Sequence, residues 1–180
     1  DFWGILPRDY MVSSEWGLPP QFENGVVPED LLSNKYGHTI HFWDLRGRKV
    51  IKSLDLGENH QMALEIRPAH DPVKEYGFCG IVAKHKHPNG EDFGYGPQMV
   101  EISRDGKRVY WTNSLYSTWD DQFYPGDRGA AMVMAHVGEN GGLTLDKDFW
   151  TKFPDGYRSH QIRLEGGDCS TDSFCYPSVG

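Results

Sequence analysis

Apolar and polar residues alternate along several short segments of the chain, which is the pattern of half-buried β-strands. In HTIHFWDLRGRKVIKSLDLG, Ile40 and Phe42 alternate with His41 and Trp43 before the turn sequence DLRGRK, and a second strand follows. MVEISRDGKRVYWTNS repeats this design around Asp105-Gly106. That dipeptide favours a tight turn because glycine tolerates positive φ. Both segments are predicted β-hairpins.

Three further regions carry strand patterns: YMVSSEWG, LEIRPAHDP followed by YGFCGIVA, and GAAMVMAHVGENGGLTLD, which turns at residues 139–142. Only VPEDLLSNKYG has helix signals, with Pro28 at an N1-like position and Gly37 as a C-cap. The chain is therefore predicted to be all-β. Hairpins recurring every few dozen residues are typical of propeller blades or of another sandwich-like fold.

A propeller blade takes about 40–45 residues, so this chain holds about four blades at most. No clean domain linker is visible. Residues 83–97 form the longest stretch without a strand pattern, and their Lys, His, Pro and Gly content predicts a loop or a join.

The net charge of -8 disfavours binding to nucleic acid or to an anionic membrane surface, because phosphate binding needs clustered Lys and Arg. No apolar run approaches the roughly 20 residues of a membrane-spanning helix. Cys79, Cys169 and Cys175 make an odd count, too few for a disulfide framework.

Several motifs together resemble the selenium-binding protein/methanethiol oxidase family: DFW…PR…MVSSEWG, YGHTIHFWDL, LEIRPAHDP, GYGPQMVEISRDGKRVYWTNSLYSTWDDQFYP, GGLTLDKDF and SHQIRLEGGDCSTD. They keep the family's order and cover most of the chain. The resemblance implies a fragment of a seven-bladed, WD40-like β-propeller. It also implies oxidation of methanethiol with oxygen and water to formaldehyde, hydrogen sulfide and hydrogen peroxide, with copper in bacterial members. Bacterial members are periplasmic and animal members largely cytosolic, so the resemblance leaves the compartment open.

The chain departs from the family pattern in two places. The family's N-terminal blades, with their additional histidines, have no counterpart here. A second gap falls within GIVAKHKHPNG. We therefore expect one propeller-type domain over residues 1–180, truncated and internally shortened, with a join near residues 83–88.

Two histidines are the candidate metal ligands implied by the resemblance. His160, ahead of LEGGDC, matches a proposed copper ligand of the family, and imidazole nitrogen suits copper. The structural alternative is a strand-end histidine held by hydrogen bonds. His70 precedes Asp71-Pro72, where a loop could aim its imidazole toward the propeller channel. Its alternative role is to cap the turn that Pro72 initiates. No catalytic residue is assigned.

Other polar side chains carry weaker hypotheses. Met132, Met134 and His136 alternate on one strand face, as a copper-binding strip or, more commonly, as core filling. His85 and His87 lie two apart, either as an adventitious metal grip or as part of a surface loop.

Glu15 and Glu65 are carboxylates within apolar strands, and buried carboxylates need partners. Each is either a base or ligand-orienting group, or a structural pair with Arg67 or Arg163. Cys169 and Cys175 lack the C-x-x-C spacing of a redox pair, although a disulfide between them is an open alternative.

Three hypotheses about function follow. The first is an oxidoreductase whose complete form is a copper-dependent methanethiol oxidase acting on a small thiol. The second is a non-catalytic selenium- or metal-binding propeller protein. The third is a fragment whose open strand edges drive self-association.

Overall fold

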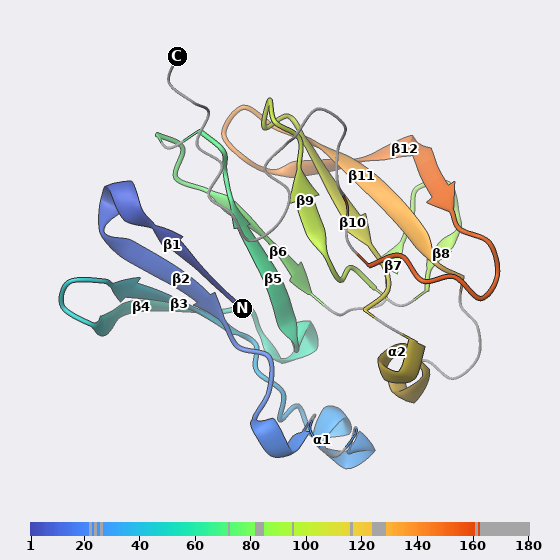
Figure 1. Ribbon diagram of the computed structural model, residues 1–180, viewed down its shortest axis with the longest axis horizontal. Coiled ribbons are helices and arrows are strands. Elements are labelled where there is room, and N and C mark those ends of the chain that lie inside the picture. Colours follow the sequence, from blue (N-terminus) through green and yellow to red (C-terminus); the bar gives the residue numbers. More distant parts are fainter. Residues whose placement is uncertain are drawn as a thin grey trace.

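The computed structural model describes residues 1–21, 23, 25, 27–71, 73–81, 85–94, 96–115, 117–123, 129–160 and 162. Over these residues the chain consists mainly of antiparallel β-strands with few and short helices (Figure 1). The all-β class predicted from the sequence is confirmed. The sheets are open and antiparallel, and the finer assignment to a partial propeller stays a prediction.

The N-terminal sheet has four strands in the order in which they follow one another along the chain. They are β1 (Phe2–Ile5), β2 (Tyr10–Ser14), β3 (Thr39–Asp44) and β4 (Lys49–Asp55). Trp3, Val12 and Phe42 lie opposite one another across three strands, as the alternating pattern requires. The predicted β3–β4 hairpin is confirmed, with a bulge between Phe42 and Trp43.

The C-terminal sheet repeats this meander. Its strands are β9 (Val100–Ile102), β10 (Arg108–Thr112), β11 (Ala131–Val137) and β12 (Leu143–Lys152). The predicted Asp105-Gly106 turn joins β9 to β10, with Gly106 at a φ of 69°. The turn between β11 and β12 likewise places Gly141 and Gly142 at positive φ. Both hairpin predictions are confirmed.

A two-stranded hairpin of β5 (Ala63–Pro68) and β6 (Gly77–Ile81) lies between the two larger sheets (Figure 1). Strand β5 contacts β1 on one side and β9 on the other. A backbone N–H of β9, that of Val100, donates to the Glu65 carboxylate of β5 at 2.6 Å. The first strands of the three sheets, β1, β5 and β9, therefore lie side by side in that order.

The largest apolar core lies between β5–β6 and the C-terminal sheet. Its fully buried side chains come from β6, β8, β9, β10 and β11: Phe78, Phe93, Val100, Ile102, Val109, Trp111, Ala131, Val133 and Ala135. The N-terminal sheet, by contrast, contributes only Val12 to the buried apolar residues of the described chain. The hydrophobic driving force is thus concentrated in the C-terminal half.

The helix predicted around Pro28 is present as α1 (Pro28–Leu32), with Pro28 at its start. The prediction of Gly37 as its C-cap is wrong, since α1 ends at Leu32 and Ser33 occupies the C-cap. A second helix, α2 (Ser117–Phe123), was not predicted. Its Trp119 is buried and packs against Trp16 with ring centroids 5.0 Å apart, so tertiary contact supports this helix.

Three 3-10 turns complete the helical elements that the structure describes: Leu6–Arg8, Pro19–Gln21 and Glu58–His60. The stretch 83–97, predicted to lack strands, contains a small hairpin of β7 (His85–Lys86) and β8 (Asp92–Phe93). Phe93 is buried in the main core, which explains why a polar stretch adopts a fixed hairpin. In the described part of the chain, no helix is both long and apolar enough to span a membrane.

Candidate functional site

The segment that carries His160 follows β12 and is fixed through its backbone and its buried neighbours. The Thr112 hydroxyl, at the end of β10, donates to the backbone carbonyl of His160 at 2.8 Å. Ser159 is buried, and its hydroxyl donates to the carbonyl of Ala131 at 3.1 Å. Ile162 packs in a small cluster with Tyr110 and Met134. Buried contacts therefore lie on both sides of His160.

The side chain of His160 itself is exposed. Among the residues that the structure describes, no hydrogen bond or ion pair holds its imidazole. The sequence alternative, a strand-end histidine held by hydrogen bonds, applies to the backbone of His160 and not to its ring. The arrangement fixes the main chain and leaves the imidazole nitrogens available as donors or ligands.

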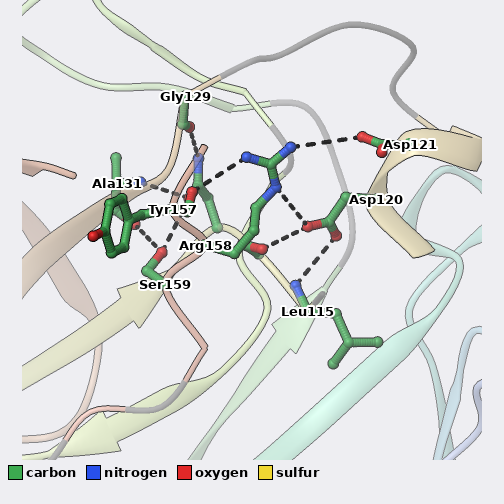
Figure 2. A network of polar contacts seen from close by, with 10 residues as sticks. Leu115, Asp120, Asp121, Gly129, Ala131, Tyr157, Arg158 and Ser159 are labelled. Atoms are coloured by element: carbon green, nitrogen blue, oxygen red, sulfur yellow. Dashed lines mark hydrogen bonds and ion pairs between the residues drawn. The ribbon is translucent and has the colours of Figure 1, made fainter. Parts of the chain in front are cut away.

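Beneath this segment, β10 ends in a buried polar run, Thr112-Asn113-Ser114. The Asn113 side chain accepts a hydrogen bond from the Ala131 N–H at 2.7 Å and donates to the Gly129 carbonyl at 2.9 Å. Figure 2 shows Gly129, Ala131 and Ser159 gathered around this point. The Asn113 side chain thereby supplies hydrogen bonds that a neighbouring strand would otherwise make, at the point where β10 and β11 separate.

Asp120 of α2 is completely buried beside the same run. Its two carboxylate oxygens accept hydrogen bonds from the Ser114 hydroxyl at 2.5 Å and from the Leu115 N–H at 3.2 Å. Burial raises the pKa of Asp120, although these two bonds and the Arg158 charge act in the opposite direction. The carboxylate is well supplied with donors yet desolvated.

Arg158 connects the His160 segment to α2 (Figure 2). Its guanidinium lies 3.7 Å from the Asp120 carboxylate and 3.6 Å from that of Asp121. It also donates to the Tyr157 carbonyl at 3.2 Å. These ion pairs exceed normal hydrogen-bond length, so they attract without fixing a strict geometry.

His70, the second predicted ligand, lies in the loop between β5 and β6, and its Nδ1 is shielded from solvent. In that loop the Asp71 carboxylate accepts a hydrogen bond from the Val73 N–H at 3.0 Å, which is a turn-capping contact. Pro72 lies outside the described residues.

The described residues do not by themselves form a copper centre. Within them, no group of three or more His, Cys, Asp or Glu side chains is placed to hold a metal ion. A copper site needs several donors, with imidazole and sulfur preferred. His160 offers one donor of suitable chemistry, and the metal-binding roles of His160 and His70 stay predictions.

The two methionines of β11, Met132 and Met134, pack in the core, as the structural alternative predicted. Met134 is buried with Tyr110 and Ile162, and Met132 packs against the same cluster. His136 is exposed and pairs with Asp146 at 2.8 Å. The surface-loop interpretation is wrong for His87, which is buried with its Nε2 2.9 Å from the Asp146 carbonyl.

The pairing predicted for Glu65 is confirmed, because its carboxylate contacts the buried guanidinium of Arg67. Glu15 pairs instead with His41, whose Nε2 lies 2.9 Å from the carboxylate. Partial burial acts to raise the pKa of Glu15, but the hydrogen bonds from His41 and Thr39, together with the nearby histidine charges, lower the pKa overall. Among the described residues, no contact joins the carboxylate of Glu15 or of Glu65 to His160.

Cys79 is a free, half-buried cysteine in β6. Burial raises its pKa to about 11, which keeps it protonated near neutral pH. Cys169 and Cys175, with the alternatives raised for them, lie outside the described residues.

The polar framework under His160 was not predicted. Asn113 and Asp120 lie within the motif GYGPQMVEISRDGKRVYWTNSLYSTWDDQFYP, but that motif alone gives them no role, and Arg158 is far from both in the sequence. The one local signal was the polar run TNS directly after an apolar strand, because polar residues at such a position must find partners when buried.

Comparison with known proteins identifies related chains. The family model described as "56kDa selenium binding protein (SBP56)" matches residues 1–87 and 79–175. A methanethiol oxidase from Xenopus laevis is 27% identical over 282 residues, which cover 96% of this chain and 60% of that protein. Selenium-binding protein 1 of Arabidopsis thaliana is 26% identical over 282 residues, covering 96% and 58%.

One solved structure is also similar, the X-ray structure of a hypothetical selenium-binding protein from Sulfolobus tokodaii. It aligns with a TM-score of 0.61 and 36% sequence identity, over 98% of this chain and 60% of that one. The chain thus spans about 60% of the length of the relatives that it matches.

Proposed function

This chain belongs to the 56 kDa selenium-binding protein family, and from that membership we propose that its function is that of a methanethiol oxidase. The reaction is the copper-dependent oxidation of methanethiol, a small thiol, with oxygen and water. The products are formaldehyde, hydrogen sulfide and hydrogen peroxide.

The observation that carries this proposal is the family match over nearly the whole chain, joined with relatives named methanethiol oxidase from Xenopus laevis and Danio rerio. Their identities, 27% and 29%, support the family more strongly than the specific substrate.

We further propose that the sheets are blades of a partial propeller in one domain. Two four-stranded meanders flank the β5–β6 hairpin, and their first strands, β1 and β9, each lie beside β5, as the inner strands of adjacent blades do. The family match falls into two parts that overlap at residues 79–87, and the 282-residue alignment is longer than the chain. Both observations support a join near residues 83–88.

Within this proposal, His160 is a metal donor and His70 a second candidate. Copper, when bound, supplies a site at which a thiol binds as thiolate. The described residues do not complete that site, so no reaction step is assigned to it. The contribution of this chain is to fix the backbone at His160 while leaving the imidazole exposed.

An alternative function is non-catalytic binding of selenium or a metal. The relatives named selenium-binding protein favour it. A third proposal is self-association through an open edge. Strand β4 is exposed along its length, including Val50, Ile51 and Leu54, and such an edge can pair with another chain.

The test is to load the purified chain with copper and to measure bound metal, methanethiol consumption and hydrogen peroxide release, with light scattering to report the assembly state. Turnover that is lost in His160→Ala but kept in His136→Ala, another exposed histidine, supports the oxidase. Stoichiometric metal without turnover supports the binding protein instead. Turnover that survives His160→Ala removes His160 from the site.

A further inference from the structure

The segment 157–160 has no regular secondary structure, so no ladder of backbone hydrogen bonds sets its path. Its course depends on individual side-chain contacts. Ser159 and the His160 carbonyl attach it to β10 and β11. Arg158 attaches it to α2, a different element.

These two attachments differ in strength. The Ser159 hydrogen bond is buried and the Thr112 hydrogen bond partly buried; both have ordinary lengths, and they hold the backbone at residues 159 and 160. The ion pairs of Arg158 are longer and lie one residue before Ser159. They hold the chain two residues before His160.

Asp120 does not depend on Arg158 for its hydrogen bonds, because Ser114 and Leu115 already supply them. What Arg158 adds is a charge beside a desolvated carboxylate, an attraction that grows as the local dielectric falls. That attraction draws residue 158 toward α2. His160, two residues further along, is exposed, whereas Ser159 and Ile162 on either side of it are buried.

We propose that Arg158 is a positioning residue: its ion pairs with Asp120 and Asp121 tie the segment to α2 and thereby set the orientation of the His160 imidazole. The relevance of this orientation to metal binding rests on the proposed function. The orientation itself does not, so the two can be tested separately.

The first measurement uses the metal-free chain. The ring resonances of His160 are assigned by their loss in His160→Gln, and their shifts and relaxation are recorded by NMR in Arg158→Gln. We expect shifted and more mobile His160 ring signals in that variant. The control is Arg108→Gln, which removes an exposed ion pair of the same 3.6 Å length at the β9–β10 turn. It leaves the His160 signals unchanged.

The second measurement is Cu²⁺ affinity, followed through the nitrogen hyperfine signature of a coordinated imidazole. Loss of a group that orients a ligand histidine costs about 10-fold or more in affinity. We expect that loss in Arg158→Gln, with partial recovery in Arg158→Lys, and no change in Arg108→Gln. If wild-type protein shows no His160-dependent copper signal, the proposed function fails while the metal-free result still decides the positioning role.

Unchanged His160 ring signals in a folded Arg158→Gln protein would overturn the proposal. If that variant does not fold, Asp121→Asn takes its place, because it removes the exposed partner of Arg158 and leaves the buried carboxylate intact. A smaller shift in the same direction supports the proposal, and no shift overturns it.

Discussion

The two four-stranded sheets have the same antiparallel meander but opposite patterns of burial. In the C-terminal sheet, β9 and four of the five residues of β10 are buried, and Val100, Ile102, Val109 and Trp111 belong to the main core. In the N-terminal sheet, every residue of β3 is only half-buried and every residue of β4 is exposed. The same topology therefore rests on different forces in the two halves.

The N-terminal sheet relies on side-chain hydrogen bonds between neighbouring strands. The Trp43 indole N–H donates to the Ser13 hydroxyl at 2.8 Å. In β3, His41 Nδ1 lies 2.8 Å from the Ser53 hydroxyl of β4, and His41 Nε2 lies 2.9 Å from the carboxylate of Glu15, which follows β2. Bonds of this kind, open to water, stabilise weakly in comparison with apolar burial. The rigid base for the His160 segment is thus the C-terminal sheet.

The largest expected contrast comes from removing the same side chain in each sheet. Ile102→Ala in β9 removes a buried side chain from the core and should cost about 2–5 kcal/mol of unfolding free energy. Ile51→Ala in β4, at 56% exposure, should change it by less than about 0.5 kcal/mol. Urea denaturation of both variants measures the difference. Equal losses would contradict the contrast between the sheets.

Much of this fold could be predicted because strand pattern and turn chemistry are local. Asp105-Gly106 marked its hairpin, and the alternation around Ile40 and Phe42 marked another; both are present. The short helix α2 was missed because it is supported by packing of Trp119 on Trp16, about a hundred residues earlier in the sequence. Local signals contain no such contact.

In the candidate site, too, local sequence predicted one part and tertiary contacts determine the rest. The family motif around His160 led to that residue, but the partners that hold its segment could not be found by spacing. Asp120 and Arg158 meet only when α2 and the segment after β12 pack together. The burial of Asn113 likewise depends on where β10 and β11 separate. Such contacts arise from the tertiary arrangement rather than from neighbouring residues.

A second contrast concerns polar side chains. Asn113→Ala removes the acceptor of the buried Ala131 N–H and the amide that donates to the Gly129 carbonyl, so we expect a loss of about 2 kcal/mol. Ser13→Ala removes the acceptor of the Trp43 indole, which is only partly buried and can be hydrated, so the loss should stay below about 1 kcal/mol. Thermal and urea unfolding give both values. A larger loss in Ser13→Ala would show that the N-terminal network carries more of the stability than its exposure suggests.

The smallest contrast lies in the two hairpin turns, which meet the need for positive φ differently. The β9–β10 turn uses Gly106 at 69°, whereas the β3–β4 turn places Arg48 at 51°. A Cβ at Gly106 meets no atom within 4 Å, so Gly106→Ala tests the backbone alone and should cost about 1 kcal/mol. Arg48→Gly relieves the same strain but adds chain entropy to the unfolded state, so we expect a gain smaller than about 1 kcal/mol. Opposite signs in urea denaturation are therefore the expected outcome. A loss in Arg48→Gly would mean that the arginine side chain stabilises the first turn by more than its backbone strain costs.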